Sequence, residues 1–164
     1  MAACVLSNQC KTNKSYFLVQ AIAGALFSIQ FALLGAWSGF IFNAFGVLRS
    51  GFCELFKRRG FLFRGIILES VLSLCMLVTV FALGDLWYLA LMIFVAQSAG
   101  TLAMCKRDGR LIRLAQLCAV SPLWLAYNLI LPLPSIGGVI CECFNILSVL
   151  ISFLRFKKSG FEKN

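Results

Sequence analysis

The sequence predicts an all-α membrane protein, a polytopic bundle of six transmembrane helices forming one domain over residues 1–164. Hydrophobic residues make up 61% of the 164 residues, and the mean hydropathy is +0.92. A soluble domain of this size leaves too much of its area in water to hide so much apolar surface. Apolar runs close to the roughly 17–25 residues that cross a bilayer also recur along the chain.

The six expected spans lie between charged residues. They are 16–37, 38–48, 65–84, 86–105, 114–131 and 135–154. The third span contains Glu69 and the sixth contains Glu142, whereas the other four carry no charge. The second span is short enough to be re-entrant or interfacial instead, so its crossing needs a separate argument.

Charge placement supplies that argument. All 15 Lys and Arg residues fall in four clusters, and the turns between the clusters carry none; the clusters are 11–14, 49–64, 106–113 and 155–163. If every segment crosses, the four clusters share one side, as the positive-inside rule requires. We therefore expect both termini of this chain in the cytoplasm, with Arg49 extending to the cytoplasmic headgroups.

The net charge of +9 then has a simple explanation, because the basic residues flank spans and orient the protein. The lipid bilayer is the expected partner, with anionic lipid attracted to the basic loops. We expect no nucleic-acid binding.

The composition also limits the chemistry. There is no histidine, which excludes His-ligated metals and histidine acid–base catalysis. Cys141, Glu142 and Cys143 do not form a metal site on a helix, because residues i and i+2 point to different sides. The eight cysteines fall within spans or at their cytoplasmic ends, so we expect no structural disulfide. We expect no metal, no cofactor and no enzymatic activity.

An internal repeat organises the chain. Residues 10–49 and 105–155 both open with Cys-Lys and a polar patch, then continue through a helix, a short uncharged turn, a glycine and a second helix to an arginine. In this alignment Phe27 matches Trp124, Phe31 matches Asn128, Gly39 matches Gly138, and Asn43 corresponds to Glu142. Both copies start and end on the same side, which makes the repeat parallel.

The repeat divides the chain into three parts: a first half-repeat over 10–56, a linker helix over 65–84 and a second repeat over 86–156. A complete unit has three helices. The chain therefore has two of the three helices of the first unit, then the single linker helix, then the three helices of the second unit. Met1–Cys10 aligns with the last turn of Leu86–Cys105, as if the opening helix of the first unit were missing.

Three stretches carry a family resemblance: LLGAWSGFIFNAFGVLRS, AMCKRDGRLIRLAQ, and PLWLAYN followed by SIGGVICECFNILSVLISFLRF. Together they resemble the YgjV family of bacterial inner-membrane proteins over most of residues 10–156. The resemblance implies a bacterial inner-membrane location but no reaction, since the family has no established activity. Its members typically have a further N-terminal helix, from which this sequence departs. A 3+1+3 arrangement is similar to that of SWEET and PQ-loop transporters by analogy.

Glu142 is the most informative single residue. A carboxylate within a span costs roughly 2.5–3.5 kcal/mol, so it normally faces the bundle interior or a wet cavity. Asn145 lies on the same helix face at i+3, and Asn43 lies at a comparable depth in the first copy. One interpretation is a small cavity for a polar solute, lined by Asn43, Trp124, Tyr127, Asn128, Glu142 and Asn145. In it Glu142 would hold a cation or exchange a proton, and Trp124 would stack on a ring-shaped solute. The alternative interpretation is a buried polar knot that only locks helices together.

Two further features have structural interpretations. Glu69 follows Arg64 by five residues near the cytoplasmic end, and we expect these two to pair or extend outward together. A seam of small residues runs along the first span: Ala21, Ala25, Ser28, Ala32, Gly35 and Gly39. Such a seam lets another helix approach closely, within the bundle or in a homodimer.

Three functions are compatible with these patterns. The first is a small-solute transporter or facilitator with a pseudo-symmetric core. The second is a structural or accessory membrane protein that binds another inner-membrane component. The third, an intramembrane enzyme, lacks an evident catalytic partner for Glu142. The sequence names no substrate, coupling ion or oligomeric state.

Overall fold

A computed structural model describes residues 2–84, 86–131, 134–156 and 160 of the chain, and all its regular elements are helices. The α-helices are α1 (Ala2–Asn8), α2 (Asn13–Leu33), α3 (Trp37–Leu55), α4 (Phe61–Leu77), α5 (Trp87–Lys106), α6 (Gly109–Ala115), α7 (Ser121–Ile130) and α8 (Ile136–Arg155). Two π-helical turns are continuous with them, η1 (Val78–Ala82) after α4 and η2 (Gln116–Val120) between α6 and α7. The all-α prediction is thus confirmed for the described residues.

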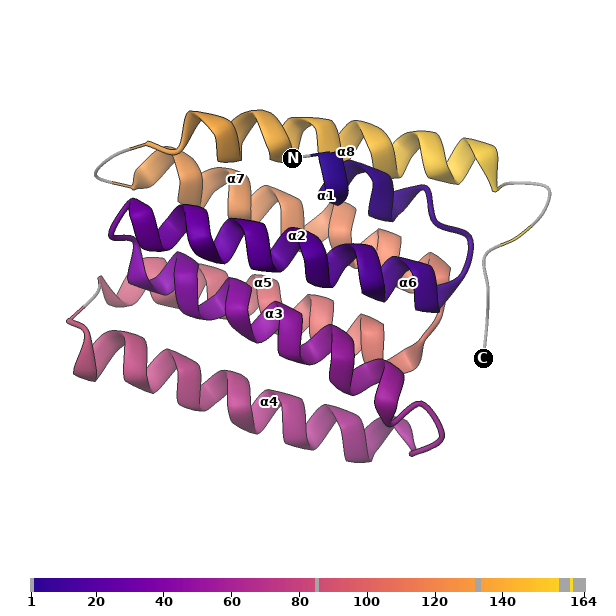
Figure 1. The fold of residues 1–164 in the computed structure, drawn as a ribbon, viewed down its shortest axis with the longest axis horizontal. Coiled ribbons are helices and arrows are strands. Elements are labelled where there is room, and N and C mark those ends of the chain that lie inside the picture. The colour runs from indigo at the N-terminus through magenta and orange to yellow at the C-terminus, as the bar shows by residue number, and fades with distance from the viewer. Residues whose placement is uncertain (1, 85, 132–133, 157–159, 161–164) are drawn as a thin grey trace.

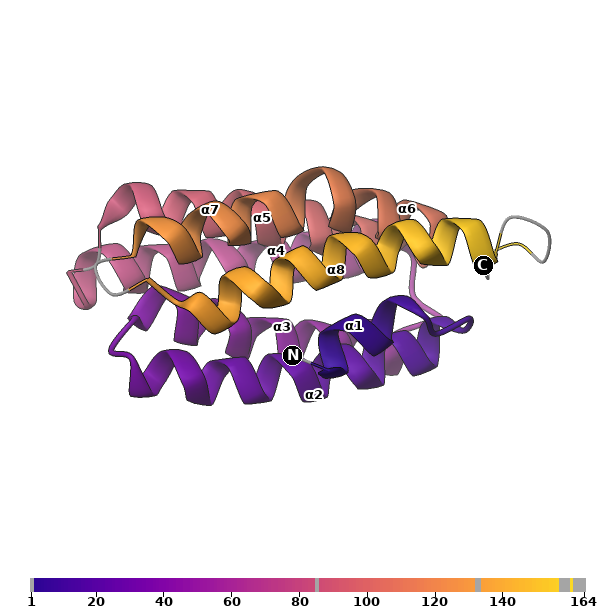
Figure 2. The ribbon, with the colours of Figure 1, turned by 90° about the horizontal axis from the view of Figure 1, so that it is seen from above.

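The long helices lie side by side along the longest axis of the molecule (Figure 1). The connections α2–α3, α4–α5 and α7–α8 gather at one end, and α1–α2, α3–α4 and α5–α6 gather at the other. Seen from above, α1, α2 and α3 form one side of the bundle, while α5, α6 and α7 form the other and α8 runs between them (Figure 2).

Four helices are long and apolar enough to cross a membrane: Asn13–Leu33, Phe61–Ala82, Trp87–Lys106 and Ile136–Arg155. They correspond to four of the six predicted spans. The other two predicted spans are also helical, in α3 and in the continuous run 109–130, but they are not among those four. Both carry polar residues that face the bundle interior, which lowers their hydropathy.

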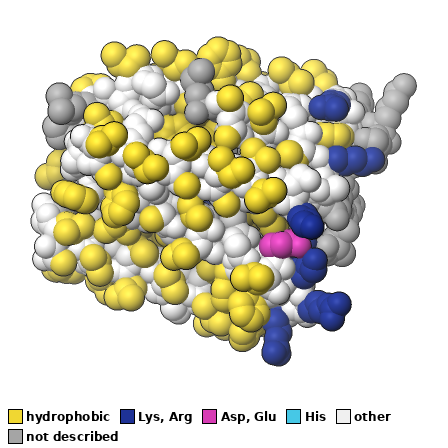
Figure 3. Space-filling model, in the orientation of Figure 1, with side chains coloured by type: hydrophobic (Ala, Val, Ile, Leu, Met, Phe, Trp, Pro, Cys, Tyr) yellow, Lys and Arg dark blue, Asp and Glu magenta, His cyan; other side chains and the backbone are white. Residues whose placement is uncertain are grey.

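The outer surface is suited to lipid. Large apolar side chains point outward on the long helices, with exposed fractions of 83% at Leu33, 81% at Phe81 and 77% at Leu154. Apolar patches of this extent are rare on soluble monomers. On the face shown in Figure 3, hydrophobic side chains are spread along the whole length of the molecule, and the Lys and Arg side chains gather at one end.

We call this end, which carries the connections α1–α2, α3–α4 and α5–α6, the basic end. Three buried arginines hold it together by donating to carbonyl groups at helix C-termini. Arg64 binds the carbonyls of Phe56 and Cys105. Arg107 binds the carbonyl of Cys53 and, through both terminal nitrogens at 3.1 Å, the carboxylate of Glu54.

Arg113 completes the set by donating to the carbonyls of Asn8 and Cys10, just where α1 ends. A helix C-terminus has unpaired carbonyls and a partial negative charge, which a cation satisfies. The basic clusters therefore lie together at one end, as predicted, although Lys157, Lys158 and Lys163 fall outside the described residues.

The predicted pairing of Glu69 with Arg64 is wrong. The Arg64 guanidinium is occupied by backbone carbonyls, whereas Glu69 Oε2 accepts a hydrogen bond of 2.7 Å from Ser98 Oγ on α5. Glu69 thus links α4 to α5 instead of extending to the headgroups.

Local sequence signals set the helix boundaries. Thr12 and Asp108 cap α2 and α6 by accepting from backbone N–H groups, and Ser135 does the same for α8. Gly35, at φ +67°, ends α2 in a left-handed turn in which Gly35 N–H donates to Ala32 and Ala36 N–H to Phe31.

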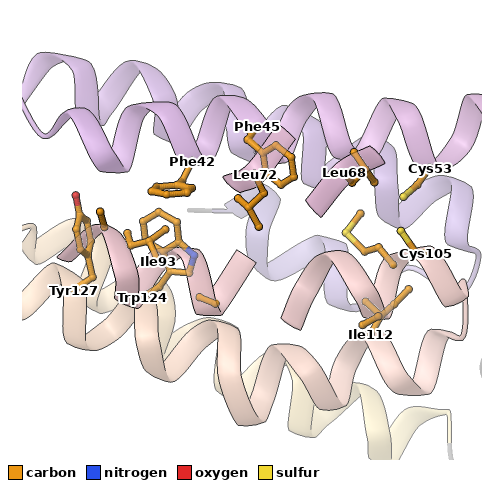
Figure 4. Close-up of a cluster of buried hydrophobic side chains, with 14 of the residues drawn as sticks. Phe42, Phe45, Cys53, Leu68, Leu72, Ile93, Cys105, Ile112, Trp124 and Tyr127 are labelled. Atoms are coloured by element: carbon orange, nitrogen blue, oxygen red, sulfur yellow. The ribbon is translucent and has the colours of Figure 1, made fainter. Parts of the chain in front are cut away.

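The core lies between α3, α4, α5 and the run 109–130. Figure 4 shows Phe42 of α3 above Ile93 and Trp124, and Phe45 of α3 beside Leu72 of α4. At the basic end, the Cys53 and Cys105 side chains face each other. The eight cysteines are free thiols, and this pair and Cys4–Cys141 are in hydrogen-bond contact.

Candidate functional site: a polar cavity inside the bundle

A cavity of about 80 Å³ lies inside the bundle, lined by residues of α1, α2, α3, α5, α8 and the run 109–130. A cavity needs roughly 10–15 Å³ to hold one water, so this one has room for several waters or for a small solute. Five of the six predicted site residues line it: Asn43, Trp124, Asn128, Glu142 and Asn145.

Glu142 is held by hydrogen bonds to its carboxylate. Asn145 Nδ2 donates to Glu142 Oε2 at 3.3 Å, and the Ser121 side chain also bonds Glu142. Gln116 Nε2 in turn donates to Ser121 Oγ at 2.9 Å. The carboxylate thus faces the interior, where polar groups from α8 and the run 109–130 surround it.

The short helix α1 joins this network. Asn8 Nδ2 approaches Asn145 Oδ1 at 3.4 Å, and Ser148 Oγ donates to the Val5 carbonyl at 2.7 Å. Gln9 Nε2 binds both the carbonyl and the hydroxyl of Ser148. These contacts fix α1 against α8 beside the cavity.

The π turn η2 brings Ser121 to its place. Pro122 lies inside the run 109–130 and has no N–H to donate to the carbonyl four residues before it. In the turn that precedes it, Ser121 N–H donates to Gln116 O. The donor and acceptor residues are one residue further apart in the sequence than in an α-helix. π turns inside α-helices are frequent at functional sites.

Asn128 and Gly138 form the tightest contact of the site. A Cβ on Gly138 would collide with the Asn128 side-chain amide, so only glycine allows the two helices to meet here. Asn128 Nδ2 donates to the Trp124 carbonyl, while Asn128 Oδ1 is buried against Gly138 and has no hydrogen-bond partner among the described residues.

The first hairpin contains an equivalent contact. A Cβ on Gly39 would lie 2.6 Å from Phe31 Cγ, so the Phe31 ring occupies the space that a side chain at 39 would need. The sequence alignment pairs Phe31 with Asn128 and Gly39 with Gly138. The two hairpins therefore share this packing, with an aromatic ring in one and an amide in the other.

Tyr127 has a different position from the other predicted site residues. It is fully buried, and its hydroxyl bonds Ser38 Oγ at 2.7 Å and accepts from Gly39 N–H at 3.0 Å. Its ring lies edge-on to Phe31 and Trp124. Tyr127 therefore joins α7 to the start of α3 behind the cavity wall, and Trp124 alone of this pair lines the cavity.

Comparison with known proteins identifies the family. The model of the Imp-YgjV family, described as a bacterial inner membrane protein, matches residues 1–160. The chain belongs to this family. No curated protein and no solved structure matches it. The chain is thus an integral protein of the bacterial inner membrane that crosses the bilayer more than once.

In this YgjV-family protein, Arg49 does not extend to the headgroups, and that prediction is wrong. The guanidinium turns inward and lines the cavity. Its Nη1 donates to Gln97 Oε1 at 2.6 Å and to Thr101 Oγ1 at 3.3 Å. Inward burial prevails because α5 supplies a row of acceptors for the guanidinium, and Phe45 supplies an aromatic face 5.9 Å from its centre.

Sequence reasoning missed the other polar residues of the cavity wall. Gln20, Gln97 and Gln116 line the cavity together with Tyr16. Each glutamine lies in a predicted span that is otherwise largely apolar, and that rarity was the available signal.

The small-residue seam of the YgjV-family chain is divided in the structure. Ser28 and Gly39 are buried, Ala21 and Ala32 are half-buried, and Ala25 and Gly35 are exposed. Helices α2 and α3 also approach each other closely at Gly24, a glycine outside the seam. A Cβ on Gly24 would lie 3.1 Å from Val47 Cγ2 and 3.2 Å from Asn43 O.

Proposed function

We propose that this YgjV-family protein is a small-solute transporter or facilitator whose binding site is the cavity around Glu142. The observation that supports it best is the convergence of polar groups on one cavity. Asn43, Asn128 and Glu142 come from three different helices and line the same cavity. Polar and ionisable residues inside a membrane protein typically mark a pathway for a solute or ion.

The proposal includes six crossings, with the basic end in the cytoplasm. The run 109–130 is 22 residues and α3 is 19 residues. At 1.5 Å per residue these are about 33 and 28 Å long, close to the thickness of a hydrocarbon core. The excess of Lys and Arg at one end supports that orientation.

The proposal also includes two like-oriented units related by pseudo-symmetry. Helix α1 contacts α2 of its own unit and α8 of the other, and α5 contacts α7 of its own unit and α3 of the other. The contact of Phe31 with Gly39 in the first unit likewise corresponds to the contact of Asn128 with Gly138 in the second. Cavities between repeats of this kind are where many transporters bind their substrates.

A structural or accessory role is the second candidate, and one observation favours it. The hydrogen bonds of Glu142, Asn145 and Asn8 join α8 to α1 and to the run 109–130. Such a network could serve only to lock helices together. The cavity beside these groups favours the carrier. A polar cluster that only holds helices together would be close-packed, with side chains filling the space that the cavity occupies.

Uptake into proteoliposomes tests the proposal. The solutes are radiolabelled neutral polyols, small carboxylates, small amines and amino acids, and the variants are Glu142→Gln and its matched control Glu69→Gln. We expect at least one solute to enter faster than in protein-free liposomes. Loss of a charge-assisted hydrogen bond, about 1.5–3 kcal/mol, should slow uptake about ten- to hundredfold in Glu142→Gln. Glu69 does not line the cavity, so Glu69→Gln should keep near-normal uptake.

Thermal unfolding of both variants distinguishes the two candidates. A carrier site predicts that Glu142→Gln unfolds close to the wild-type midpoint. Failure of every solute to enter, or equal uptake by the two variants, would contradict the carrier. Unfolding of Glu142→Gln well below the wild-type midpoint would favour the structural role.

A further inference from the structure

We propose that the cavity binds a small zwitterionic solute, with its carboxylate at Arg49 and its ammonium group at Glu142. This inference rests on the proposed carrier function and names the substrate class of the same site. It depends on two opposite charges that line one cavity without pairing.

Arg49 provides the cationic side of the cavity. Its Nη1 is bound to neutral acceptors on α5, the carbonyl and amide oxygens of Gln97 and the hydroxyl of Thr101. Its Nε is buried and has no hydrogen-bond partner among the residues that the structure describes. A carboxylate is the group that a guanidinium binds best, through parallel hydrogen bonds to its nitrogens.

Glu142 provides the anionic side. Its partners, Asn145 and Ser121, are neutral. Asn145 and Asn128 line the cavity together with Glu142. An ammonium group carries three N–H donors and could donate to this carboxylate.

Neither charge is neutralised within the described part of the chain. Ion pairs within 4 Å are formed there by Glu54 with Lys57 and Arg107, and by neither Arg49 nor Glu142. Glu69 acts on Arg49 through space, but its Oε2 is bound to Ser98. Because burying an unpaired charge is costly, a ligand that supplies both counter-charges gains from both sites.

A glycine lies between the Arg49 guanidinium and the turn before Ser121. A Cβ on Gly100 would lie 3.2 Å from Arg49 Nη1 and 3.4 Å from Val120 Cγ2. Val120 directly precedes Ser121, which bonds Glu142. The guanidinium therefore faces, across Gly100, the turn that holds the carboxylate.

The size of the cavity and its two charges together define the solute. An anion alone leaves Glu142 without a counter-charge, and a cation alone leaves Arg49 without one. A volume of about 80 Å³ suits a short chain with an ammonium group at one end and a carboxylate at the other.

Ligand binding to the purified full chain in lipid nanodiscs tests this assignment. Trp37 and Trp87 are exposed, so Trp37→Phe and Trp87→Phe leave Trp124 in the cavity wall as the only tryptophan reporter. The probes are linear ω-amino acids from glycine to 6-aminohexanoate, which vary the charge separation. Each is compared with the carboxylic acid and the amine of the same chain length.

We expect at least one ω-amino acid to change the Trp124 fluorescence and to bind at least about tenfold more tightly than its matched acid and amine. In Arg49→Gln that amino acid should bind no better than the matched amine, and in Glu142→Gln no better than the matched acid. Arg49→Lys, which keeps the charge, should retain part of the preference. The control variants Arg110→Gln and Glu69→Gln are at positions outside the cavity. Arg110→Gln should retain all of the preference, and Glu69→Gln, which removes only a charge that acts on Arg49 through space, should retain most of it.

The outcomes separate this inference from the carrier proposal. If no ω-amino acid binds better than its matched acid and amine, or if the control variants lose the preference equally, the zwitterion assignment is overturned. Glu142-dependent uptake of a neutral polyol with no preference for zwitterions would overturn the assignment and leave the carrier standing. Absence of both uptake and binding would overturn the two together.

Discussion

At the scale of single residues, the adjacent glycines Gly137 and Gly138 have different roles. A Cβ on Gly138 would collide with the Asn128 amide, whereas one on Gly137 would lie 3.9 Å from Gln30 Nε2, an ordinary contact. Gly138→Ala should therefore destabilise the protein by about 1–3 kcal/mol. Gly137→Ala is the matched control and should be neutral or gain up to about 1 kcal/mol of helix propensity.

Thermal unfolding in detergent micelles measures both changes. If Gly138→Ala proves as stable as Gly137→Ala, the close contact between α7 and α8 is wrong. A side chain at position 138 would displace the Asn128 amide. The amide would then lose its hydrogen bond to the Trp124 carbonyl.

Most of the predicted site could be found residue by residue, because a polar side chain within an apolar span is conspicuous. Glu142, Asn145 and Asn43 were predicted on that ground and line the cavity. Arg49 could not be placed in this way. It lies at the border between a span and a basic cluster, and its direction depends on acceptors on α5, 48 residues later in the chain.

At the scale of elements, the predicted helices are present but their ends differ from the prediction. The segment expected to end at residue 48 continues as α3 to Leu55, and the run expected from residue 114 starts at Gly109. The sequence contained the reason in the second case, since Asp108 caps the helix at its N-terminus. In the first case, Arg107 donates to the Cys53 carbonyl in the last turn of α3, which allows α3 to continue past Arg49 and Glu54.

Pro122 gives a prediction for the run 109–130. Pro122→Ala restores a backbone N–H, so the helix should lose its π turn and shift Gln116 relative to Ser121. We expect the variant to unfold at the same temperature as wild type or higher, since proline inside a helix costs up to about 3 kcal/mol. Uptake in proteoliposomes should fall, because Ser121 would no longer reach Glu142.

Pro134→Ala, at an exposed position of the α7–α8 connection, is the control and should change neither quantity. Normal uptake by Pro122→Ala would show that the π turn has no part in the site.

At the scale of the whole molecule, charge segregation predicts the topology. On a background without native cysteines, we compare Leu34→Cys in the α2–α3 connection with Arg58→Cys in the α3–α4 connection. A membrane-impermeant maleimide should label Leu34→Cys in intact spheroplasts and Arg58→Cys only after the membrane is permeabilised. The reverse pattern would contradict the proposed orientation, and labelling of both in intact cells would contradict the crossing of α3.

The order of the spans along the chain could be predicted from the sequence better than the way in which the helices pack against one another. Composition and charge spacing predict spans and a common basic end, because both follow from transfer free energies that act locally. The docking of α1 between α2 and α8 depends on hydrogen bonds between residues more than 130 positions apart, such as Gln9 with Ser148. No local pattern encodes such a contact.

The two ends of the bundle are closed by bonds of different strength. At the basic end, guanidinium groups hold the helix termini, and hydrogen bonds to charged groups contribute about 1.5–3 kcal/mol each. At the opposite end, the bonds of Tyr127 with Ser38 and of Gln30 with Ser135 are neutral and contribute about 0.5–1.5 kcal/mol each. For a carrier, this difference makes separation of the helices easier away from the arginines, so the resting population should be biased toward access from the periplasm.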